Sequence, residues 1–130
     1  MQAKGRIHWL AVLAGTLLDN VLSLLIGGIA ISITPDIGQG SYFTSTAATV
    51  TWVLLVLCTV AGGWLAGRIA KHERFLHGFM VGGFGIVLLL LNSWLGGQVT
   101  LDQLALVFVA AGLAGLAGYS SRWMPARERK

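Results

Sequence analysis

The sequence predicts an all-α integral membrane protein, in which a bundle of four helices crosses the bilayer. Of the 130 residues, 55% are hydrophobic and 11% are charged, and the mean hydropathy is +0.77, whereas about 25% of the residues in an average soluble domain are charged. Four apolar stretches are each long enough for the roughly 20 helical residues that cross a hydrocarbon core. They are 8–33, 47–69, 75–97 and 102–121. This length and composition predict a single membrane domain over residues 1–130.

The first apolar stretch ends at Thr34-Pro35, because proline disfavours the helical conformation in the residue before it. Lys4 and Arg6 precede the stretch, so it can also be interpreted as a signal peptide. The apolar region of a signal peptide is usually about 7–15 residues long, and this stretch is longer and contains Asp19. We therefore expect it to be retained as a membrane-spanning helix.

The second stretch can begin at a cap supplied by Ser45 or Thr46, because a hydroxyl group suits the N-cap position. The connection at 70–74 is so short that the second and third stretches are expected to form an antiparallel hairpin. Glycine tolerates backbone conformations that end a helix, so Gly96-Gly97 allows the third stretch to end and the chain to turn.

The fourth stretch begins with Thr100 and Gln103, which have the spacing of a capping box. Its connection to the third stretch is also short, so these two are expected to form a second antiparallel hairpin. Four helices joined in this way predict a compact bundle.

The basic residues predict how the bundle is oriented. All nine fall before the first stretch, around the connection between the second and third, or after the fourth, and the connections 34–46 and 98–101 contain none. Cytoplasmic connections are enriched in Lys and Arg, so both termini are expected to be cytoplasmic, in a prokaryotic inner membrane. The net charge of +4 is then explained by the orientation of the chain in the membrane and does not indicate a nucleic-acid partner.

No pattern in the sequence supports an enzyme. There is no Ser/His/Asp, Cys/His or metal-ligand constellation, and the single cysteine, Cys58, lies within an apolar stretch and has no partner for an internal disulfide. We expect a protein that is not an enzyme and that has no metal site and no cofactor.

The most unusual residue is Asp19, which lies in the first stretch on a stripe with Gly15, Ser23 and Gly27 at four-residue spacing, next to Asn20. At 1.5 Å per residue it lies about 16 Å from the start of the stretch, near the bilayer midplane. A carboxyl group at that depth costs about 2.5–3.5 kcal/mol on the insertion scale, which the many apolar residues of the stretch offset at about 0.3–0.6 kcal/mol each. Asp19 is therefore expected to face protein or water, and to be protonated or connected to water at neutral pH.

Two interpretations of Asp19 remain open. As a membrane-embedded acid that exchanges a proton, it would form the proton or cation site of a transporter. Alternatively, hydrogen bonds from Asp19 and its neighbours fix the bundle or an oligomer. The hydrogen-bond partners that side-chain chemistry allows are Asn20, Ser23, Thr59, Asn92 and Ser93.

Small residues recur at helical spacing in the other three stretches. Because lipid gives helices no hydrophobic reason to associate, close helix contacts need small side chains. These residues predict tight contacts, either within one chain or between copies. The principal positions are Gly63, Gly67, Gly78, Gly82 and Gly115.

The connection between the second and third stretches concentrates polar side chains. It suggests either a pH-sensing or phosphate-binding patch or a basic anchor that meets lipid headgroups. The residues concerned are Arg68, Lys71, His72, Arg74 and His77.

Residues 61–83, AGGWLAGRIAKHERFLHGFMVGG, resemble a pattern found in small uncharacterised four-span bacterial membrane proteins, including the YrzE-like group. The shared features are a Gly-Gly-aromatic helix end, a basic turn and a Leu-His-Gly start of the next helix. The resemblance implies a four-helix inner-membrane protein and carries over no established site.

Two transporter families of similar size differ from this chain. Asp19 is similar in position to the acid in the first span of small multidrug-resistance transporters, but their usual residue is Glu, and the strong charge bias here differs from that of the dual-topology members. The Arg-containing, Gly-rich first helix of fluoride channels and the Phe/Thr-rich break in their third helix are not found in this sequence.

The sequence therefore favours an accessory or assembly protein of the lipid bilayer, which packs against copies of itself or against a larger membrane complex. The alternative is a small oligomeric transporter coupled to protons or cations through Asp19.

Overall fold

A computed structural model describes residues 7–35, 45–96 and 99–123. All the regular structure in these ranges is helical, and four helices are long and apolar enough to span a membrane, as the sequence predicts. A single turn of 3-10 helix follows the last of them. The elements are α1 (Trp9–Ile33), α2 (Thr46–Ala70), α3 (Arg74–Trp94), α4 (Leu101–Ser120) and η2 (Ser121–Trp123).

Side-chain caps begin α2 and α4. The cap of α2 is Ser45, whose Oγ accepts a hydrogen bond from the backbone N–H of Ala48 at 3.1 Å. Thr100 and Gln103 form the predicted capping box of α4, with each side chain accepting from the backbone N–H of the other residue. Both caps satisfy N–H groups that the first turn of a helix leaves without a partner.

The ends of α1 and α3 follow from proline and glycine. Helix α1 ends at Ile33, and its C-cap, Thr34, lies immediately before Pro35, as predicted. Helix α3 stops at Trp94, earlier than the predicted residue 97, because Gly96 has a φ of 95° and an α-helix cannot continue through that conformation. Gly97 lies outside the described residues.

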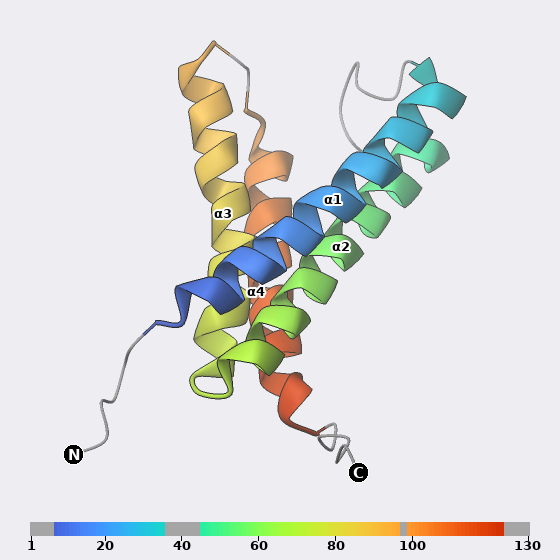
Figure 1. Ribbon diagram of the computed structural model, residues 1–130. Helices are drawn as coiled ribbons and strands as arrows, with labels where there is room; N and C mark the ends of the chain where they lie inside the picture. The colour runs from blue at the N-terminus through green and yellow to red at the C-terminus, as the bar shows by residue number, and fades with distance from the viewer. Residues whose placement is uncertain (1–6, 36–44, 97–98, 124–130) are drawn as a thin grey trace, which may run out of the picture.

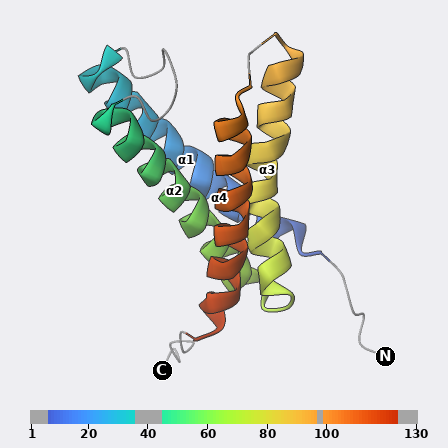
Figure 2. The same ribbon diagram turned by 180° about the vertical axis from the view of Figure 1, so that it is seen from behind.

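The helices form two antiparallel pairs, α1 with α2 and α3 with α4 (Figure 1). The pairs meet at one end of the molecule, where Lys71 and Glu73 turn the chain from α2 into α3 with φ values of 59° and 45°; we call this the turn end. They diverge toward the opposite, open end, and the view from behind shows the same fork (Figure 2). The compact bundle predicted from the sequence is thus closed at one end only.

Glycines allow the helices to pack closely at the turn end. A Cβ atom added at Gly63 would lie 2.5 Å from the carbonyl oxygen of Ala114, and one added at Gly67 would lie 2.5 Å from that of Gly118. The same holds between α1 and α2, where a Cβ at Gly15 would lie 2.5 Å from the backbone of Gly62. The small residues of these helices therefore contact one another within one chain.

Candidate functional site

Asp19 connects the two helices of the first pair. Its Oδ1 atom accepts hydrogen bonds from the hydroxyl of Ser23, one turn along α1, at 3.3 Å and from the hydroxyl of Thr59 in α2 at 3.1 Å. The Asp19 side chain is half-buried. Both donors act on one oxygen, and no donor among the described residues binds Oδ2.

Asp19 lines a cavity of about 380 Å³ that receives residues from all four helices. Its other polar side chains are Asn20, Ser23, Thr59 and Trp52, and Asp19 is the one charged group in its lining. The remaining lining is apolar. It consists of Leu55, Val56, Gly82, Gly85, Leu88, Leu89, Leu106, Val107 and Ala110.

Two of the other predicted partners, Asn20 and Ser93, do not bind Asp19. Asn20 instead donates from Nδ2 to the carbonyl oxygen of Thr16 at 2.8 Å, within its own helix. Ser93 is exposed in the last turn of α3, and the side chain of Asn92 lies outside the described residues. The two ends of the stripe formed by Gly15, Asp19, Ser23 and Gly27 differ in packing. Gly15 packs against α2, whereas a Cβ added at Gly27 would meet nothing within 4 Å.

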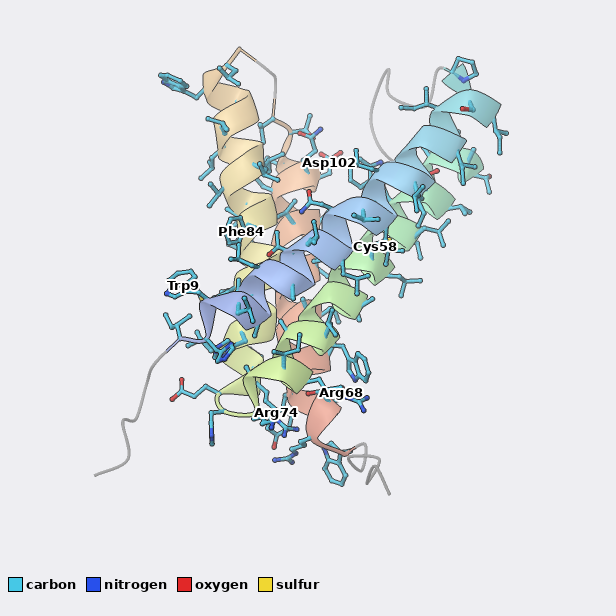
Figure 3. The ribbon with its side chains drawn as sticks, viewed as in Figure 1. Trp9, Cys58, Arg68, Arg74, Phe84 and Asp102 are labelled. Atoms are coloured by element: carbon cyan, nitrogen blue, oxygen red, sulfur yellow. The ribbon has the colours of Figure 1, made fainter. Side chains whose placement is uncertain are left out.

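Two residues of this region were not evident from the sequence. Trp52 of α2 lines the cavity, although nothing in the sequence marked it as a partner of Asp19. Asp102 is half-buried in the first turn of α4, on the helix face that carries Leu106 and Ala110, because four-residue steps return to the same face. Figure 3 shows Asp102 near the open end, on the side of the fork. Asp102 and the small residue Ala110 are separated by two four-residue steps, and this spacing is the signal in the sequence that could have placed Asp102 on this face of α4.

The five polar residues predicted as one patch at the turn end do not all lie together. The guanidinium carbon of Arg68 lies 5.1 Å from the centre of the Trp64 ring, and His72 is exposed. Arg74 donates from Nε to the carbonyl oxygen of Lys71 at 3.3 Å. Figure 3 shows Arg68 and Arg74 at this end.

His77 points into the protein, where it is 2% exposed. Its Nδ1 lies 3.0 Å from the carbonyl oxygen of Glu73, and its Nε2 accepts a hydrogen bond from the backbone N–H of His8 at 2.8 Å. A carbonyl oxygen only accepts, so Nδ1 is the nitrogen that donates to Glu73, while Nε2 is the acceptor. His77 therefore joins the start of α1 to α3 and is not part of an exposed basic patch.

No protein-family model, curated protein or solved structure matches the chain. The resemblance of residues 61–83 to the YrzE-like group therefore stays a prediction. Within the described ranges, no three His, Cys, Asp or Glu side chains gather as a metal site would require.

Proposed function

We propose that this chain is a small, non-enzymatic transporter of a prokaryotic cytoplasmic membrane, with both termini cytoplasmic, and that Asp19 is its proton or cation site. The observation that carries the proposal is the position of one carboxyl group in an otherwise uncharged cavity lined by four apolar helices. An ionisable group inside a membrane protein is costly and is usually retained for a function.

The lengths of the helices support membrane insertion. Helices α1 and α2 have 25 residues each, and α3 and α4 have 21 and 20, so the pairs are about 37 Å and about 31 Å long. The longer pair leans relative to the shorter pair (Figures 1 and 2). Tilting allows a longer helix to cross the same hydrocarbon thickness of about 30 Å.

The distribution of charged and aromatic residues supports the orientation. The described basic residues Arg68, Lys71, Arg74 and Arg122 belong to the turn end, which the positive-inside rule assigns to the cytoplasm. Exposed tryptophans lie at the ends of helices, where interfacial tryptophans are enriched. They are Trp9, Trp94 and Trp123.

The hydrogen bonds of Asp19 suit reversible binding. Two hydroxyl groups hold Oδ1 in place, while Oδ2, which no donor in the described ranges binds, is the atom that would take a proton or a cation. Release of that ligand would leave a carboxylate that still has two hydrogen bonds, which lowers the cost of the charged state. Asp102 nearer the open end adds a second negative charge on the path from the outside, and this charge would raise the local concentration of cations.

Asp19→Asn tests the proposal because it keeps the shape and abolishes proton exchange. The protein would be reconstituted into liposomes that contain a pH-sensitive dye, and proton flux would be measured on addition of Na⁺, K⁺ or tetraphenylphosphonium. We expect at least one cation to drive flux in the native protein and none in Asp19→Asn.

The matched control is Ser32→Ala, which removes a hydroxyl of α1 that binds the Gly28 carbonyl oxygen and does not line the cavity. It should keep the native flux. Equal flux in the native protein and in Asp19→Asn would refute the role of Asp19.

An accessory or assembly role is the second candidate, and one observation favours it. Cβ atoms added at Gly27 or Gly28 would meet nothing within 4 Å, so at these two positions α1 is not packed against another described helix. A helix of another copy or of a larger complex would fit there. Purification in mild detergent, followed by identification of the co-purifying proteins, tests this role, and Asp19→Asn should then keep the same partners.

A further inference from the structure

We propose that the turn end carries a specific binding site for an anionic phospholipid with two phosphate groups. The site is a second cavity, of about 550 Å³, between the α2–α3 turn, the start of α3 and the end of α4. Three cationic side chains, Lys71, Arg74 and Arg122, line it together with a single acid, Glu73. The proposal rests on the membrane insertion proposed above and not on any activity of Asp19.

The arginines of this cavity are oriented by their neighbours. The guanidinium carbon of Arg122 lies 3.9 Å from the centre of the Tyr119 ring and 5.0 Å from that of Trp123, while Arg74 is held through its Nε by the Lys71 carbonyl oxygen. Stacking occupies the flat faces of a guanidinium and leaves its N–H edge for hydrogen bonds, and that edge matches the oxygens of a phosphate. Less conformational freedom is then lost when a phosphate binds.

The charge of the cavity is not neutralised within the described part of the chain. None of the three cations forms an ion pair there, and the three cations with one carboxylate have a net charge of +2. Two phosphodiester groups, with one negative charge each, complement that charge. A lipid with one phosphate would neutralise half of it.

Apolar side chains next to the cations favour a lipid over a free phosphate. Phe75 is 45% exposed and Leu76 is 38% exposed, and both line the cavity beside the arginines. A phospholipid would place its phosphates on the cations and its acyl chains along these two residues. Free phosphate would use the cations alone. Basic pockets between helices at the cytoplasmic face are a known mode of anionic-lipid recognition.

Native mass spectrometry of the purified protein in detergent tests the site. The protein would be titrated with cardiolipin, which carries two phosphates, with phosphatidylglycerol, which carries one, and with inorganic pyrophosphate. We expect cardiolipin to bind at least tenfold more tightly than phosphatidylglycerol at equal phosphate concentration. Pyrophosphate should displace cardiolipin only weakly.

Two variants distinguish lipid binding at this cavity from a general electrostatic attraction of anionic lipid to the turn end. The double variant Arg74→Gln/Arg122→Gln should lose at least tenfold in cardiolipin affinity. The matched control is Arg68→Gln, which removes a cation at the same end that does not line the cavity and should change affinity less than twofold.

Three results would overturn the proposal: equal affinity for the two lipids, an equal loss in Arg68→Gln, or complete displacement of cardiolipin by pyrophosphate at micromolar concentration, which would indicate a site for a free phosphate. Because Asp19→Asn should bind cardiolipin as the native protein does, failure of the lipid site is distinguishable from failure of the transport function.

Discussion

Replacing Gly82 with alanine should destabilise the protein, whereas the same replacement at the adjacent Gly83 should not. A Cβ atom added at Gly82 would overlap the Cα atom of Ala111 in α4 and lie 2.8 Å from its Cβ. One added at Gly83 would meet nothing within 4 Å. The two positions belong to one helix and one sequence neighbourhood, so each serves as the control for the other.

The expected loss of stability in Gly82→Ala follows from the steric overlap with Ala111. Ordinary van der Waals contact begins at 3.4 Å, so α3 and α4 must separate by about 0.6 Å to clear the Cβ of Ala111 and by about 1 Å to clear its Cα. A gap of about 0.5–1 Å forfeits a quarter to a half of each contact's attraction. Overpacking against groups that cannot move typically costs about 1–3 kcal/mol. Both variants gain the same helix propensity, up to about 1 kcal/mol, which cancels when they are compared. Gly82→Ala should therefore be about 2 kcal/mol less stable than Gly83→Ala.

The assay is unfolding of the purified protein in mild detergent by titration with sodium dodecyl sulfate, followed by circular dichroism. A difference of about 2 kcal/mol corresponds to about a 30-fold change in the unfolding equilibrium constant. Equal stabilities, or a more stable Gly82→Ala, would refute the direct contact between α3 and α4 at this position.

The same titration checks two further contacts. His77→Leu should be about 1–3 kcal/mol less stable than His77→Gln. Glutamine can still accept the hydrogen bond from the backbone N–H of His8, whereas leucine leaves that N–H without its partner. Equal stabilities would show that this hydrogen bond contributes nothing. Gly78→Ala should cost about 1 kcal/mol more than Gly115→Ala. The Cβ of Gly78→Ala would meet a backbone carbonyl of α4, whereas that of Gly115→Ala would meet the edge of a phenylalanine ring, which can rotate. A larger loss of stability in Gly115→Ala would contradict this expectation.

Local signals in the sequence predicted the elements well. The ends of α1, α2 and α4 lie within a residue of their predicted positions, because proline, Ser45 and the Thr100–Gln103 capping box act over a few neighbouring residues. The end of α3 was placed too late. A glycine permits a helix to end but does not decide at which residue it does so.

The candidate site was predictable only in part. Ser23 was one of five residues that side-chain chemistry allowed as partners of Asp19, and four-residue spacing puts it on the same face of α1. Thr59 was one of several residues that chemistry allowed, and its contact depends on the register between α1 and α2, which the chain pattern does not determine. The inward direction of His77 was likewise not evident, because a histidine in a basic turn is usually exposed.

The sequence by itself determined four apolar helices, all of their limits except the end of α3, and the concentration of basic residues on one side, since length, hydropathy and capping are properties of short segments. The tertiary structure decided that the glycines of α2, α3 and α4 pack within one chain, that the helix pairs diverge, and that Asp19 lies in the resulting cavity. These features depend on which helix faces meet. In a chain whose helices are apolar on nearly every face, the hydrophobic pattern leaves that choice open, and the fit between small side chains decides it.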